Sequence, residues 1–334
     1  MSIVVSVFSP QASNNGTTLL SMLLSMNIAC TRKKVCLIHA NRVSPEFKKY
    51  LGLKEIENSM SMDQVARLIK GEALQSQQLK NYSRQIDDID FLDVISNKDE
   101  NLSQENMNII RDFIINQDIY DYVVIDLDLD FNNPTTKDIL KKSNIIVLNI
   151  GHSLKEADKF KSIETVFKKT VGNIPVLRVV AKYNETGGRL QDFDRYMGNT
   201  GIVKNDNILG KLNIQKPSSF KIHYNAFLTW GTNNNKLPIV FKNIRNKDNR
   251  IIEVSNDLNE LMTCIYRNSI ALQRLKNGTR VALEESDKET KEVKKSIFKK
   301  KETVSNEKSE KELKEKREKT SDDEKVVGGE DFAQ

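Results

Sequence analysis

Cysteine is scarce in this sequence, with only Cys30, Cys36 and Cys264 among 334 residues. Their spacing matches no metal-ligand pattern and their number is odd, which argues against a structural zinc site and a disulfide framework. Such cysteine usage is typical of a reducing compartment, where thiols stay free. We therefore expect three buried thiols.

Long apolar runs are also missing. No window approaches the roughly 18 consecutive apolar residues that a membrane-spanning helix requires. The first residues do not combine a basic segment with an uninterrupted apolar stretch, so a secretory signal peptide is not expected. These two absences favour a cytoplasmic protein.

Apolar residues become sparse beyond Leu283, where lysine and glutamate dominate. Such a composition cannot bury enough surface to offset the entropy of ordering the chain. We expect an α/β domain over residues 1–277 and a charged, largely disordered tail over residues 278–334. Within the tail, Lys294–Lys301 places five lysines around two apolar residues. This segment would contact an anionic membrane or nucleic acid, or it is simply solvated.

A strand, a loop and a helix are predicted at residues 3–24, the arrangement in which a phosphate-binding loop occurs. A working loop reads G-x-x-x-x-G-K-[ST], and its lysine reaches the β- and γ-phosphates while its hydroxyl holds magnesium. Counted back from Thr18, the lysine position holds Thr17, the second glycine is kept as Gly16, and Gln11 replaces the first. The loop therefore keeps the shape of a phosphate site without its main charge.

Two interpretations of this loop remain open. Asn14 and Asn15 can adopt left-handed backbone geometry, and the start of a helix favours an anion. Asn14, Asn15, Gly16, Thr17 and Thr18 would then form a nucleotide cradle from backbone N–H groups. Alternatively, the loop is a plain strand-to-helix turn.

Short runs that are apolar at nearly every position alternate with helical patterns along the chain, as in a parallel sheet covered on both faces. After the strand near the N-terminus, strands are expected over residues 35–39, 90–96, 122–126, 144–150, 176–181 and 208–212. The mildly basic charge of the first 280 residues is compatible with an anionic partner, but a lysine-rich composition gives the same charge without any partner, and we favour the second interpretation.

The helical patterns are less uniform than the strands. The first helix is expected to run to about Thr31, and residues 53–84 are expected to be polar and helical, with one apolar side. A later helix is expected to pack one apolar side on the sheet, formed by Leu154, Ala157, Phe160, Ile163 and Val166. The last helix is expected to bury Val254, Leu258, Leu261, Met262, Ile265 and Leu272.

Aromatic residues concentrate between Lys216 and Pro238. Clusters of this kind either cover the edge of a sheet or form a surface for a partner. The residues concerned are Phe220, Ile222, Tyr224, Phe227, Leu228 and Trp230. The sequence leaves both uses open.

Several segments resemble the MinD/ParA group of P-loop ATPases in their order and spacing. They comprise residues 3–24, 34–41, 120–126 and 144–155, and Tyr120–Asp126 with the segment after it is the most specific. The likeness covers about residues 1–275. It implies a P-loop NTPase-type α/β fold with a mostly parallel twisted sheet and helices on both faces.

Other segments are most similar to one branch of that group, the CpaE/TadZ proteins, which help to localise pilus and secretion machinery. These segments are Lys182–Asn184, Ile208–Leu212, and Gly231 with Leu237–Pro238. Members of this branch commonly lack the second lysine of the loop. The threonine at position 17 therefore fits the branch.

The resemblance also implies a site. The group's loop reads K-G-G-x-G-K-[ST]-T, and its first lysine crosses a dimer interface to the partner's nucleotide; here the two lysine positions hold Ala12 and Thr17. ATP and magnesium are the implied cofactors, a homodimer the implied assembly, and Thr18 and Asp126 the implied magnesium ligands. The D-x-D motif, whose second aspartate polarises the attacking water, is replaced by His39-Ala40-Asn41.

Phosphoryl transfer depends on positioning and on charge neutralisation, so losing both lysines and that aspartate removes most of the catalytic contribution. We expect a non-catalytic or nearly inactive factor that localises or assembles a secretion, pilus or conjugation apparatus. Its partners would be proteins of that apparatus, and the factor would be recruited to the membrane or cell pole. The alternative is an ATP-dependent switch in plasmid or chromosome partition. In that case DNA would be held by Lys242, Arg245, Lys247 and Arg250.

Overall fold

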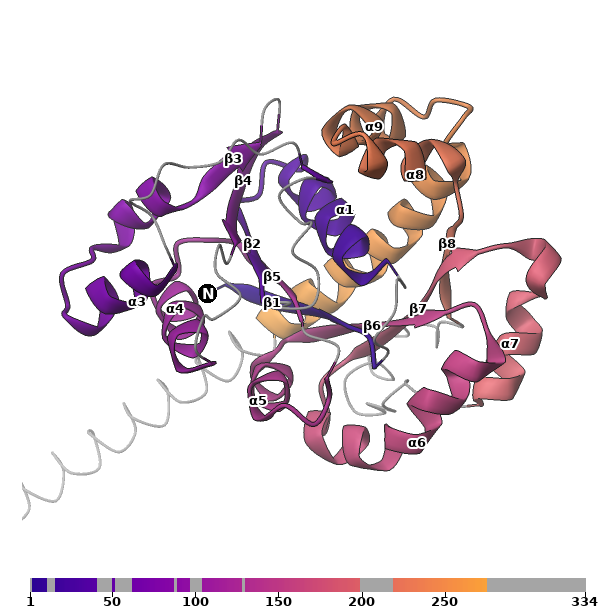
Figure 1. Cartoon of the computed structure of the whole chain (residues 1–334), viewed down its shortest axis with the longest axis horizontal. Coiled ribbons are helices and arrows are strands. Elements are labelled where there is room, and N and C mark those ends of the chain that lie inside the picture. Colours follow the sequence, from indigo (N-terminus) through magenta and orange to yellow (C-terminus); the bar gives the residue numbers. More distant parts are fainter. Residues whose placement is uncertain are drawn as a thin grey trace, which may run out of the picture. The chain divides into compact units, whose positions relative to one another are not determined.

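The computed structural model describes residues 2–10, 16–40, 50–51, 62–86, 89–96, 104–127, 130–198 and 219–274. The chain divides into two compact units, Met1–Leu272 and Gln273–Gln334. The first unit contains the sheet and the helices that cover it (Figure 1). The expected strand at residues 208–212 and the expected tail from residue 278 lie outside the described residues.

The described residues form eight strands of one sheet, in the order β3-β4-β2-β5-β1-β6-β7-β8. Only β3 runs antiparallel to its neighbour, so seven strands are parallel. The strands are β1 (Ile3–Phe8), β2 (Val35–His39), β3 (Arg84–Ile86), β4 (Ile89–Ser96), β5 (Tyr122–Asp126), β6 (Ile145–Gly151), β7 (Val176–Tyr183) and β8 (Phe220–His223). The predicted mostly parallel sheet is confirmed.

Alternating side chains along each strand divide the core into two layers. In β1, Ile3, Val5 and Val7 face one layer, whereas Val4 and Phe8 face the other. The first layer is completed by α1 (Thr17–Ala29), α8 (Ala226–Asn233), α9 (Leu237–Arg245) and the helix that starts at residue 252. The second is completed by α3 (Met62–Lys70), α4 (Gln104–Asn116), α5 (Pro134–Lys142), α6 (Leu154–Val171) and α7 (Leu190–Met197). Figure 1 shows α1, α8 and α9 on one side of the sheet and α4, α5 and α6 on the other.

The prediction of which residues of α6 pack on the sheet is correct only in part. Ala157 and Phe160 are buried as expected, but Leu154 and Val166 are 56% and 51% exposed. A spacing of three residues turns a helix by about 300°, so each step drifts by about 60° and the ends of a five-residue series leave the buried side. The helix instead buries Phe167, together with Val171 at the next turn.

The interval expected to be helical up to residue 84 is also corrected. Helix α3 ends at Lys70, and Glu72 has a φ of 52°, which no helix continues. A 3₁₀ segment (Ser76–Tyr82) and the strand β3 follow. Within α3, the side chain of Val65 is buried as expected. The last helix likewise buries the expected residues Val254, Leu258, Leu261, Met262 and Ile265.

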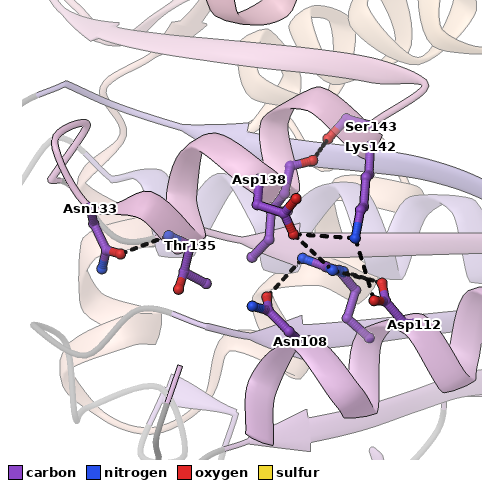
Figure 2. Close-up of polar contacts among 9 residues, drawn as sticks. Asn108, Asp112, Asn133, Thr135, Asp138, Lys142 and Ser143 are labelled. Atoms are coloured by element: carbon purple, nitrogen blue, oxygen red, sulfur yellow. Dashed lines mark hydrogen bonds and ion pairs between the residues drawn. The ribbon is translucent and has the colours of Figure 1, made fainter. Parts of the chain in front are cut away.

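A charged cluster joins α4 to α5 on one side of the sheet (Figure 2). The guanidinium of Arg111, only 1% exposed, lies 2.6 Å from Asp112 Oδ1 and 3.0 Å from Asp138 Oδ2. Lys142 Nζ lies 3.4 Å and 3.3 Å from the second oxygen of Asp112 and from Asp138 Oδ2. Asn108 accepts a third bond from the guanidinium at 2.9 Å. This cluster holds together two helices that support β1 and β5.

The three cysteines are free thiols, but only Cys36 is fully buried, and burial raises the pKa of its thiol well above the ordinary value. Cys30 and Cys264 are partly buried, so the expectation of three buried thiols holds for one. Among the described helices, none is long and apolar enough to cross a membrane.

Candidate functional site

The candidate site lies where β1, β2 and β5 end. These strands are adjacent and parallel, so their carboxyl ends meet at one edge of the sheet. The register places His39 opposite Asp126 across the β2–β5 pair. Residues that are distant in the sequence therefore come together at this edge, which is where ligands bind in open α/β sheets.

The carboxylate of Asp126 is held by two protein groups. Its Oδ2 lies 2.9 Å from Nδ1 of His39, and its Oδ1 accepts a hydrogen bond of 3.3 Å from the hydroxyl of Ser21 in α1. The three residues are 3% exposed or less. A buried carboxylate is tolerated only when it is paired or hydrogen-bonded. Here His39 is the nearer partner. The single hydroxyl proton of Ser21 is shared between Asp126 and the carbonyl of Thr17, 3.0 Å away.

The start of α1 lies beside this cluster. Gly16 is the residue before the helix and has a φ of 74°, which favours glycine over any residue with a side chain. Thr17 and Thr18 are its first two residues and are buried, and the hydroxyl of Thr17 accepts a bond of 3.1 Å from the amide of Asn149 in β6. The structure thus brings Gly16, Thr17 and Thr18 to the same edge as Asp126. The predicted cradle residues 14 and 15 lie outside the described residues.

Lys182, the residue before the end of β7, lies close to Gly16. A β-carbon placed on Gly16 would lie 3.9 Å from Cε of Lys182. Lys182 has a φ of 53°, an uncommon conformation for a residue with a side chain. Burial raises the pKa of Glu156, at the start of α6, while Lys159 and Lys182 lower it, so Lys182 also acts electrostatically on the start of α6.

Lys182 was not predicted as a site residue, because the lysines that contact phosphates were expected only within the loop. The signal was present, since Lys182 follows a strand predicted to be parallel to the first one. The carboxyl ends of parallel strands share one edge, so a lysine after any of them is a candidate for the loop's missing charge.

The described side chains provide few oxygen ligands for a magnesium ion by themselves. Magnesium requires nearly octahedral oxygen ligands, and both oxygens of Asp126 already have protein partners. Within the described ranges, no group of three or more His, Cys, Asp or Glu side chains could hold a metal ion. The assignment of Thr18 and Asp126 to magnesium stays a prediction. Each carboxylate oxygen keeps a second lone pair beside its contact with His39 or Ser21, so Asp126 would hold the ion through water with both contacts in place.

Comparison with known proteins identifies relatives of the fold. No model of a protein family matches the sequence, and no curated protein matches it. Among solved structures, the MinC:MinD cell division protein complex of Aquifex aeolicus matches with a TM-score of 0.54 and 15% identity, covering 78% of this chain and 96% of that one. A ParA family ATPase from Chlorobium tepidum TLS matches with a TM-score of 0.54 and 14% identity, over 78% and 98% of the two chains.

A third solved structure contains a nucleotide. The septum site-determining protein MinD from Pyrococcus horikoshii OT3, complexed with Mg-ADP, matches with a TM-score of 0.53 and 13% identity, over 78% of this chain and 98% of that one. These similarities establish that residues of the first unit have the P-loop NTPase-type fold of MinD and ParA ATPases. At such identities they establish the fold alone.

Proposed function

We propose that this chain is a MinD/ParA-like protein with little or no ATPase activity, similar to the CpaE/TadZ branch. It acts as a localisation or assembly factor for a secretion, pilus or conjugation apparatus. The observation that carries the proposal is the buried contact between His39 and Asp126. In this role the domain of residues 1–277 and the charged tail work through protein partners at the membrane or cell pole.

The chemistry of this contact supports the proposal of low activity. In the similar ATPases, hydrolysis depends on an aspartate that polarises the attacking water, on cations that neutralise the phosphates, and on a carboxylate near magnesium. Here Asn41 stands at the position of the water-polarising aspartate, and His39, at the first aspartate position of the motif, binds the remaining carboxylate, Asp126. The segment from residue 9 to residue 29 has no lysine. The domain keeps the fold of these ATPases, while Asp126 at the sheet edge is bound by a histidine of the same chain.

The test is ATP hydrolysis by the full chain with and without magnesium, compared with the variant Thr18→Ala. A contaminating ATPase gives the same rate in both preparations, so equal rates at background level support the proposal. A magnesium-dependent rate that disappears in Thr18→Ala would contradict it. Thr18 is a suitable control because it is the hydroxyl position of the loop and lies at the start of α1.

A second candidate function is an ATP-dependent partition switch that binds DNA. One observation favours it, namely that Lys182 reaches Gly16 and supplies a cation at the start of α1. Lys242, Arg245, Lys247 and Arg250, the residues predicted to hold DNA, are all exposed. The discriminating measurement is retention on DNA with and without ATP over a range of salt concentrations, because phosphate contacts release counterions. Retention that needs ATP and falls steeply with salt supports the switch over the assembly factor.

A further inference from the structure

The surface formed by α8, α9 and residue 250, which we call the α8–α9 surface, carries two stacked aromatic rings with a cation next to each. The rings of Phe227 and Trp230 are stacked with centroids 5.4 Å apart and an interplanar angle of 7°. Arg250 lies over Phe227 at 4.5 Å, and Lys236 lies over Trp230 at 5.6 Å. The α8–α9 surface therefore places a cation next to each ring.

Apolar side chains on this surface face outward. Trp230 is 41% exposed and Ile239 is 51% exposed. Ile239 is three residues from Lys236, which precedes α9, and three from Lys242 in its last turn, so each lysine neighbours Ile239 along the helix. The neighbouring aromatic-rich strand behaves differently, because Phe220 and Ile222 are buried at the sheet edge. The two uses left open by the sequence thus divide between strand and helix.

The charge of this part of the chain is one-sided. Residues 219–251 contain six lysines and arginines and a single acidic residue, Asp248, whereas the whole chain has a net charge of only +6. Asp248 forms an ion pair with Arg250, whose guanidinium lies 2.6 Å from its carboxylate. The segment therefore presents mainly positive charge, and Lys236 and Lys242 are both exposed.

The two helices are packed tightly enough to present this surface in one shape. A β-carbon on Gly231 would lie 2.4 Å from Cγ2 of Val240, so α8 and α9 approach each other closely at that point. Asn225 caps α8 by accepting bonds from the N–H groups of Phe227 and Leu228. A preformed surface loses little conformational entropy on binding.

We propose that the α8–α9 surface binds a protein segment in which acidic side chains flank an apolar one. The carboxylates would pair with Lys236 and Lys242, and the apolar side chain would contact Trp230 and Ile239. Tryptophan, tyrosine and arginine are the residues that most often dominate binding energy at protein interfaces. This inference rests on the proposed function, because it names the chemistry of the partner that an assembly factor of this kind engages.

The stacking favours a protein partner over single-stranded nucleic acid. Nucleobases bind aromatic residues by stacking on a free ring face. Trp230 already has Phe227 stacked on it and Lys236 over it, so a base would have to displace one of them. A side chain that contacts the exposed part of the indole displaces neither.

The chain provides its own probe, since Trp230 is its single tryptophan. We suggest titrating the full chain with 12-residue peptides that carry four Asp or Glu residues around one leucine or phenylalanine, while the tryptophan emission is recorded. Peptides with the same charge and no apolar residue, and a single-stranded oligonucleotide of equal charge, serve as comparison ligands. The expected result is a saturable shift of the emission to shorter wavelength with the apolar peptides alone.

A matched pair of double variants tests the location. Lys236→Glu with Ile239→Ser changes the α8–α9 surface, and Lys169→Glu with Val166→Ser makes the same changes on α6, where Val166 is also 51% exposed. We expect the first variant to weaken peptide binding at least tenfold and the second to leave it unchanged. Equal binding by both variants, no emission shift, or tighter binding of the oligonucleotide would each overturn the proposal. None of these outcomes depends on ATP, so they are independent of the hydrolysis test.

Discussion

Charged groups are arranged in opposite ways at the carboxyl edge of the sheet and on the α8–α9 surface. At the edge, Asp126 is fully buried and its two oxygens are bound by His39 and Ser21. On the α8–α9 surface, Lys236 and Lys242 are exposed beside apolar side chains. The buried carboxylate of the first region is bound within the protein, whereas the second region exposes its lysines to solvent.

This difference indicates where selection for stability and for binding would act. A residue that is buried and paired cannot change alone without leaving its partner uncompensated, so the edge is expected to be sensitive to substitution. Exposed residues contribute little to folding, so the α8–α9 surface is expected to tolerate substitution in stability and to respond in binding. Measuring stability and binding for variants of both regions tests this contrast.

The largest effect is expected from His39→Ala, which breaks the pair at the edge. The variant leaves the Asp126 carboxylate buried with one donor, Ser21, and opens a small cavity, so we expect a loss of about 3 kcal/mol in the free energy of unfolding. Urea denaturation of the full chain measures it. Adding Asp126→Asn should restore more than half of the loss, because the buried charge is then absent. A loss below about 1 kcal/mol would show that the pair contributes little.

An intermediate effect is expected from Gly231→Ala, which affects the packing beneath the α8–α9 surface. The new methyl group would meet Cγ2 of Val240, and overpacking of this kind costs about 1–3 kcal/mol, more than the gain in helix propensity. Thermal unfolding measures the change, and Val240→Ala in the same chain should recover part of it. Equal stability of wild type and Gly231→Ala would mean that the two helices separate easily, so that the surface is not preformed.

Lys182→Ala is expected to affect anion binding and not folding. The ammonium of Lys182 is exposed but lies beside Gly16, so nucleotide binding at this edge should weaken about tenfold, the effect of one modest charged contact. Calorimetric titration with ATP, with and without magnesium, provides the measurement, and Lys169→Ala on the far end of α6 is the control. Equal loss in both lysine variants would indicate nonspecific attraction of the phosphates.

The sheet could be predicted from the sequence because buried parallel strands leave a simple pattern. Val35–His39 and Tyr122–Asp126 have the predicted bounds, since every residue in them is buried. The strands β3 and β8 were not predicted, because three and four residues are too few to form a distinctive apolar run.

The candidate site could be predicted only in part. The positions of Thr18 and Asp126 follow from the strand–loop–helix pattern and the order of elements in similar folds, but their contacts do not. The sequence indicated that His39 replaces a carboxylate; it could not indicate that His39 binds Asp126, because that contact depends on the order of the strands in the sheet. The contact of Lys182 with the start of α1 was missed for the same reason.

The smallest effect is expected from Lys236→Glu with Ile239→Ser, and it bears most directly on the contrast between the two regions. Lys236 precedes α9, so the new carboxylate at this position interacts favourably with the start of the helix. Two contributions are lost, namely the contact of Lys236 with Trp230 and the packing of the half-exposed Ile239 side chain. These contributions oppose each other, and we expect the free energy of unfolding to change by less than about 0.5 kcal/mol. Urea denaturation beside Lys169→Glu with Val166→Ser checks it. A loss as large as that of His39→Ala would mean that the α8–α9 surface is part of the folding core, and the contrast would fail.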